Sequence, residues 1–131
     1  MPDGGENEAA ALPVLACSSF VYRAILRKAW IDTDTGRIQS AAFMRRSSDR
    51  DGLSVSIAAA CSPEQCMAQF RACFGVASLH VGRVRDLGLD VVADAPDHAC
   101  ITGLPFQDDD PLNAERMAWL LANQARLLLR A

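Results

Sequence analysis

The sequence predicts an α+β domain, with a mixed and mainly antiparallel sheet of five or six strands and two helices packed on one face. Three observations support this class. Short segments rich in β-branched residues recur between turn signals, as in the strictly alternating run from Leu53 to Ile57. Two segments that start at Pro63 and Pro111 have the N-terminal signals of helices. Half of the 131 residues are apolar, which is enough for one core.

The first half of the chain predicts three strands. Residues 1–12 are rich in Gly, Glu, Asn and Ala, so we expect a disordered leader before a single domain over residues 13–131. Residues 20–26 have the aromatic and β-branched content of a strand. Residues 38–44 and 53–59 predict two more strands, which we expect to pair as a hairpin with a basic tip.

The next segment predicts a helix over residues 63–74. Ser62 and Gln65 have the spacing of a capping box, and Gly75 suits a helix stop. The apolar residues that recur at three and four predict one buried stripe; they are Cys66, Met67, Phe70, Cys73 and Phe74. Three strands then follow, over residues 76–84, 89–93 and 98–104.

A second helix is predicted from Pro111 to Leu129. Its apolar residues lie almost all round the helix, which indicates deep burial or a partner surface. We therefore expect self-association or a protein partner, with Trp119, Leu120, Leu127 and Leu128 at the interface.

Composition limits the function classes. Thirteen basic and sixteen acidic residues give a net charge of −3, which argues against broad nucleic-acid affinity. The start is acidic, and no apolar run reaches the length of a membrane span, so we expect a cytoplasmic protein. The five cysteines lie among apolar neighbours, and Cys61, Cys66 and Cys73 lack the paired spacing of a zinc site. No metal and no cofactor are expected, and no glycine-rich phosphate loop occurs.

A small-ligand site is the main alternative to a protein interface. Its candidate residues are polar groups set in apolar segments, namely Arg23, Ser40, Ser54, His80 and His98. The competing interpretation gives Arg23 a salt bridge to Asp51 or Asp90 and leaves the serines on an exposed sheet face. No nucleophile motif accompanies either histidine, and the sequence favours binding over catalysis.

The basic tip is the candidate for weak nucleic-acid binding. Arg45, Arg46 and Arg50 would lie near Phe43 and Tyr22, and aromatic residues beside arginines can stack on bases. A solvated basic turn explains the same residues more simply, so nucleic acid is not the expected partner.

An arginine on the first strand, serine-bearing strands and a histidine resemble the ADP-ribosyltransferase-like folds that bind nicotinamide dinucleotide. The resemblance implies that Arg23 holds a phosphate or ribose and that Ser40 or Ser54 positions the nicotinamide end. It also requires an acid to activate the acceptor. The only glutamates after the leader, Glu64 and Glu115, start helices instead.

A second resemblance covers residues 20–130. The motifs that carry it are Tyr22-Arg23, Ser40-Ala-Ala-Phe43, Asp51-Gly-Leu-Ser-Val55 and His98-Ala-Cys-Ile101, together with the segments from Ser78 to Asp90 and from His98 to Pro105. The combined pattern resembles a group of short bacterial proteins without an assigned activity. The resemblance implies a free-standing bacterial cytosolic domain. We expect a small accessory or regulatory protein that binds itself or a protein partner, with a nucleotide-like or other small anionic ligand as the alternative.

Overall fold

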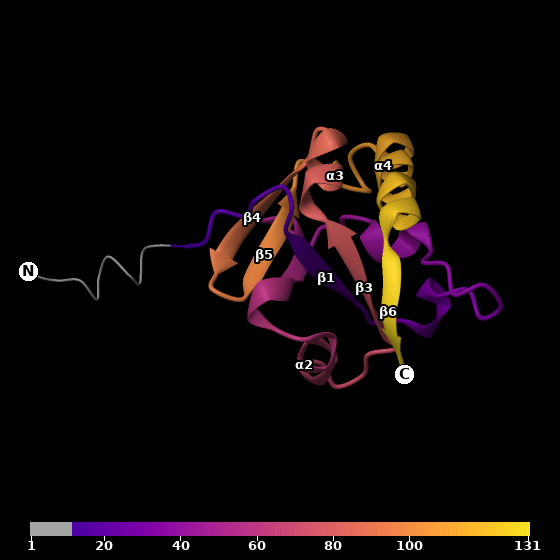
Figure 1. Ribbon diagram of the computed structural model, residues 1–131. Coiled ribbons are helices and arrows are strands. Elements are labelled where there is room, and N and C mark those ends of the chain that lie inside the picture. The colour runs from indigo at the N-terminus through magenta and orange to yellow at the C-terminus, as the bar shows by residue number, and fades with distance from the viewer. Residues whose placement is uncertain (1–11) are drawn as a thin grey trace, which may run out of the picture.

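The computed structural model describes residues 12–131 and contains one six-stranded antiparallel sheet (Figure 1). The strand order is β4-β5-β2-β1-β3-β6. The strands are β1 (Phe20–Ile25), β2 (Leu53–Ile57), β3 (Gly75–His80), β4 (Asp90–Ala95), β5 (His98–Thr102) and β6 (Arg126–Arg130). The predicted α+β class is confirmed. The predicted leader lies outside the described residues except for Leu12.

Three α-helices and three short 3-10 helices connect the strands. They are η1 (Lys28–Trp30), η2 (Ser40–Phe43), η3 (Ala58–Ala60), α2 (Pro63–Ala68), α3 (Val81–Asp86) and α4 (Pro111–Gln124). The predicted capping box starts α2, because Ser62 Oγ accepts from the Gln65 backbone amide at 3.1 Å and Gln65 Oε1 accepts from the Ser62 backbone amide at 2.8 Å. Among the described residues, no helix is long and apolar enough to cross a bilayer.

The helices lie on both faces of the sheet, which corrects the prediction that they share one. The larger core joins α3, α4 and η2 to the sheet face that carries Val21 and Ile25. Cys66 of α2 instead packs with Ala24 and Val76, which project from the opposite face because side chains alternate along a strand. An apolar stripe predicts that one side of a helix is buried, but it does not predict which face of the sheet the helix covers. The segments that connect the helix to its neighbouring strands decide that face.

Several predicted boundaries are wrong. Residues 38–44 form η2 and its flanks rather than a strand, so the expected hairpin with β2 does not exist. The predicted helix over 63–74 ends at Ala68, and the strand predicted over 76–84 ends at His80, where α3 begins. The predicted terminal helix stops at Gln124, and Figure 1 shows the chain passing from α4 directly into β6 beside β3. Ladder hydrogen bonds to β3 overrode the helical preference of the final leucines.

The central strands β1 and β2 pair over only a short length and then separate. β1 pairs with β3 from Phe20 to Ile25, but the β1–β2 ladder contains only Val21↔Ile57 and Tyr22↔Ser56. β2 meanwhile continues to pair with β5 as far as Leu53↔Ile101. Beyond Tyr22 the two strands therefore leave a gap in the sheet, and the side chain of the next residue, Arg23, enters it.

Candidate anion-binding cleft

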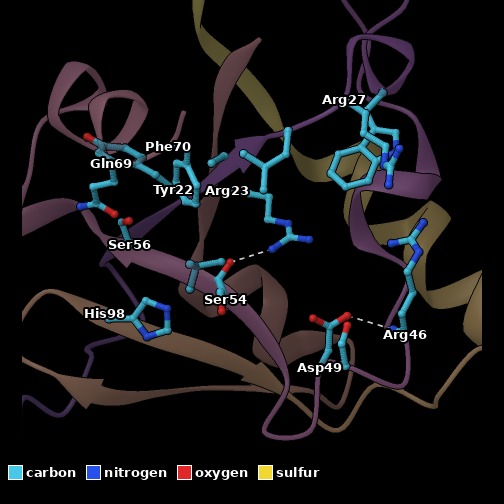
Figure 2. A pocket seen from close by; sticks show the side chains of 15 residues that line it. Tyr22, Arg23, Arg27, Arg46, Asp49, Ser54, Ser56, Gln69, Phe70 and His98 are labelled. Carbon is cyan, nitrogen blue, oxygen red and sulfur yellow. Dashed lines mark hydrogen bonds between the residues drawn. The ribbon is translucent and has the colours of Figure 1, made fainter. Parts of the chain in front are cut away.

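A cleft of about 610 Å³ opens where β1 and β2 separate (Figure 2). Its size lies within the usual range for small-molecule sites. The strands supply Tyr22, Arg23, Ala24, Ser54, Val55, Ser56 and His98, and the connecting segments supply Leu26, Arg27, Trp30, Arg46, Ser48, Asp49, Gln69 and Phe70. Polar and aromatic groups from segments far apart in the sequence thus converge on one hollow.

Arg23 projects into the middle of the cleft. Its Nε donates to the Ala42 carbonyl at 2.9 Å, and its Nη1 donates to the Ser54 carbonyl at 2.9 Å. Within residues 12–131, no carboxylate lies within ion-pair distance of the guanidinium, and Nη2 has no hydrogen-bond partner. The predicted salt bridge to Asp51 or Asp90 does not form, and Asp90 pairs with Arg85 instead.

Burial lowers the pKa of Arg23 to about 10, with the charge of Asp49 opposing this shift and that of Arg46 adding to it. The group therefore remains a cation at neutral pH. A half-buried cation with free donors is stabilised by an anion that accepts from them.

Three arginines and one carboxylate, Asp49, line the cleft. The cleft is thus net positive in a chain whose net charge is −3. Arg27 is exposed at the edge, and Arg46 holds its guanidinium 5.6 Å from the centre of the Trp30 ring. Asp49 is engaged by the Arg46 amide at 2.9 Å, a bond drawn in Figure 2. This distribution attracts an anion rather than a cation.

Aromatic side chains form part of the walls. Tyr22 comes from β1, Trp30 from η1, and Phe70 follows the end of α2. Phe70 is 38% exposed, so part of its ring is available to contact a ligand. Aromatic rings beside arginines suit a ligand that combines a planar group with an anionic one.

A polar row continues the cleft across the sheet. Ser54 and Ser56 of β2 lie opposite Cys100 and His98 of β5. His98 Nδ1 is 2.6 Å from Asp94 Oδ1, and this contact lowers the pKa of Asp94. Burial, together with the nearby Asp94 charge, raises the pKa of the Cys100 thiol to about 11, so without a bound metal ion this side chain is a neutral thiol at neutral pH.

No protein-family model, curated protein or solved structure matches this chain.

Three of the five predicted ligand residues meet in the cleft, namely Arg23, Ser54 and His98. Ser40 lies in η2 with its hydroxyl 3.5 Å from Glu115. His80 caps α3 by accepting from the Arg83 amide at 3.3 Å, and its ring packs edge-on against Phe20. Neither residue lines the cleft.

The three arginines of the expected basic tip have different surroundings. Arg45 donates to the carbonyls of Asp49 and Leu104 at 2.9 and 2.8 Å, donates to that of Arg50, and stacks on Phe106. Arg46 lines the cleft, and only Arg50 is exposed. Since the hairpin does not form, these three arginines do not share the single basic tip that the sequence predicted.

The predicted interface residues divide between α4 and β6. Trp119 is 55% exposed and Leu128 is 42% exposed, whereas Leu120 and Leu127 are half-buried. Leu127 packs against the larger core.

Many residues that line the cleft were not predicted as ligand residues from the sequence. Phe70 was predicted as part of a buried helical stripe, but α2 ends before it. Arg27 and Trp30 follow the strand predicted over residues 20–26, and neither was predicted to belong to a site. A signal for their role was the clustering of arginines between residues 23 and 50, although it did not distinguish structural arginines from cleft arginines.

Proposed function

We propose that the protein binds a small anionic ligand with a planar group, nucleotide-like in chemistry, in the cleft around Arg23. The single observation that carries this proposal is the guanidinium of Arg23, which is fixed by two backbone carbonyls and has no carboxylate partner among the described residues. The hydrogen bonds of Nε and Nη1 hold the Arg23 guanidinium in place, with its remaining N–H groups directed into the cleft. Little side-chain entropy is therefore lost when an anion binds.

The other lining groups support the same class of ligand. Arg27 and Arg46 add positive charge around the anion, and Trp30 and Phe70 offer apolar contact to a ring. Ser54 and His98 provide neutral polar groups that can hydrogen-bond to a sugar or a base edge. The proposal is one of binding, and it assigns no reaction to these residues.

A thermal-shift panel tests the proposal with AMP, ADP, nicotinamide dinucleotide, inorganic pyrophosphate, short RNA and short DNA. We expect stabilisation by at least one nucleotide, weaker stabilisation by pyrophosphate, and loss of both effects in Arg27→Met. Arg27 is exposed, so its replacement should leave the fold intact. Arg116→Met on the exposed side of α4 is the matched control and should respond like the wild type. No stabilisation by any compound, or an equal response from both variants, would count against the cleft.

A second candidate function is self-association through the C-terminal surface. Trp119 is a large exposed aromatic side chain on α4, and β6 is an edge strand that ends the sheet. Multi-angle light scattering should give a dimer for the wild type and a monomer for Trp119→Glu. A wild-type monomer at high concentration would remove this candidate.

A further inference from the structure

A second cluster of chemistry-bearing side chains lies beside the cleft, at the junction of β4 and β5. Ala93 pairs with Ala99 and Ala95 pairs with His98, so Asp94 is an extra residue in a β-bulge. Bulges re-aim side chains and are frequent at functional sites. Here the bulge brings the Asp94 carboxylate over the same sheet face as His98 and Cys100.

The carboxylate contacts both neighbours at once. Oδ1 is 2.6 Å from His98 Nδ1, and the Cys100 thiol donates to Oδ2 at 3.6 Å. One nitrogen, one oxygen and one sulfur from the three side chains lie within 4.8 Å of one another. His98 and Cys100 are two residues apart on one strand, which fixes their spacing independently of Asp94.

The donor set selects a class of ion. Nitrogen, sulfur and a single carboxylate are ligands for zinc and similar transition metals, whereas calcium and magnesium require oxygen shells. Three protein ligands would leave one position of a tetrahedral ion for water or a bound molecule. Cys100 is buried, His98 is half-buried and Asp94 is exposed, so an ion has access from the solvent side.

We propose that Asp94, His98 and Cys100 bind a divalent transition metal ion of the zinc class at the rim of the cleft. This inference goes beyond the ligand proposal, because it depends on none of the arginines. The two sites adjoin through His98, which also lines the cleft. The site was not predicted from the sequence, because Asp94, His98 and Cys100 do not have the paired spacing that is typical of structural zinc sites.

The test titrates the reduced, chelator-treated full chain with Co²⁺, a spectroscopic substitute for Zn²⁺. We expect one tetrahedral Co²⁺ ion per chain, bound with release of the Cys100 thiol proton to solvent, and a thiolate-to-cobalt absorption band that disappears when Zn²⁺ replaces Co²⁺. Asp94→Asn and His98→Gln change accessible residues, and each should weaken Co²⁺ binding at least tenfold. Cys100→Ser should abolish the thiolate band.

Controls separate this site from the other thiols and from the cleft. Cys61→Ser and Cys17→Ser should keep the band, and Arg27→Met should bind Co²⁺ like the wild type. The proposal is overturned if the wild type gives no thiolate band, if the band survives Cys100→Ser, or if Asp94→Asn and His98→Gln bind Co²⁺ with unchanged affinity. The measured quantity is metal binding alone. A negative result here would therefore not count against anion binding in the cleft, and a negative result in the nucleotide panel would not count against metal binding at this site.

Discussion

Arg23 Nη1 donates to the backbone carbonyl of Ser54 at 2.9 Å, across the point where β1 and β2 part. The arginine thereby replaces a strand-to-strand hydrogen bond, and its Nε ties the same side chain to Ala42 of η2. The Arg23 side chain therefore bridges the two strands where they separate, and its remaining N–H groups face the cleft.

Replacing Arg23 should cost stability as well as binding. Arg23→Met removes the donors of two carbonyls, and each unpaired backbone carbonyl costs about 1–3 kcal/mol when buried. Relief of the buried charge and solvent in the open cleft offset part of this cost, so we expect the free energy of unfolding to fall by about 1–2 kcal/mol. Urea denaturation of Arg23→Met beside Arg116→Met measures the difference. A more stable Arg23→Met would contradict the bridging role.

Arg45 should matter more to stability than any other arginine of its loop. It donates to three carbonyls and lies over the Phe106 ring at 3.8 Å. We expect Arg45→Met to lower the free energy of unfolding by about 2–3 kcal/mol. Arg50→Met, which changes an exposed side chain of the same loop, is the control and should shift it by less than about 0.5 kcal/mol. Equal urea midpoints for the two variants would refute this assignment.

Gly52 is expected to be the least replaceable turn glycine. Its φ is +126°, and an added Cβ would meet the Ile101 carbonyl oxygen, so alanine forces β2 away from β5. Gly88 also has a positive φ, +85°, but has open space around it. We expect Gly52→Ala to lower the melting temperature far more than Gly88→Ala, which should cost about 1 kcal/mol. Similar losses in both variants would show that the close approach is unimportant.

Acid should weaken the link between α3 and β4. The hydrogen bond from Arg85, with help from the Val91 amide, lowers the pKa of Asp90. The pKa of Asp90 is lower in the folded chain than in the unfolded chain. The interaction therefore stabilises the fold fully at pH values above the unfolded-state pKa, and the stabilisation is lost as the pH falls through the folded-state pKa. Asp90→Asn should therefore be less stable than the wild type at pH 7, by about 0.5 kcal/mol for so exposed a pair, and equally stable near pH 2. Urea melts at both pH values test this, and a difference that persists in acid would contradict it.

Local signals in the sequence predicted some elements well. Ser62 and Gln65 identify the start of α2 because the capping box consists of hydrogen bonds within four residues, and alternation identifies β2 because successive side chains of a strand point to opposite faces of the sheet. The end of α4 and the strand β6 could not be predicted this way. Leu127, Leu128 and Leu129 suit a helix locally, and only pairing with β3 makes them a strand.

The cleft was predictable only in part for a similar reason. Arg23, Ser54 and His98 stood out as polar residues in apolar strands, and they do line the cleft. Ser40 and His80 carried the same signal but lie elsewhere: the Ser40 hydroxyl contacts Glu115 of α4, and His80 accepts from the Arg83 amide at the start of α3. The separation of β1 from β2 that creates the cleft is a tertiary feature, and no residue pattern encodes it.

Binding of a small anionic ligand in the cleft around Arg23 can be measured directly. At 14.1 kDa the chain suits a ¹⁵N-correlation NMR titration with ADP and, in parallel, with inorganic pyrophosphate. We expect ADP to shift the amide resonances of Tyr22, Arg23 and Ser54, and also that of Phe70, whereas pyrophosphate should shift only the resonances of the arginine-lined part of the cleft. Unchanged spectra at saturating concentrations of both compounds, or shifts confined to α4 and β6, would contradict it.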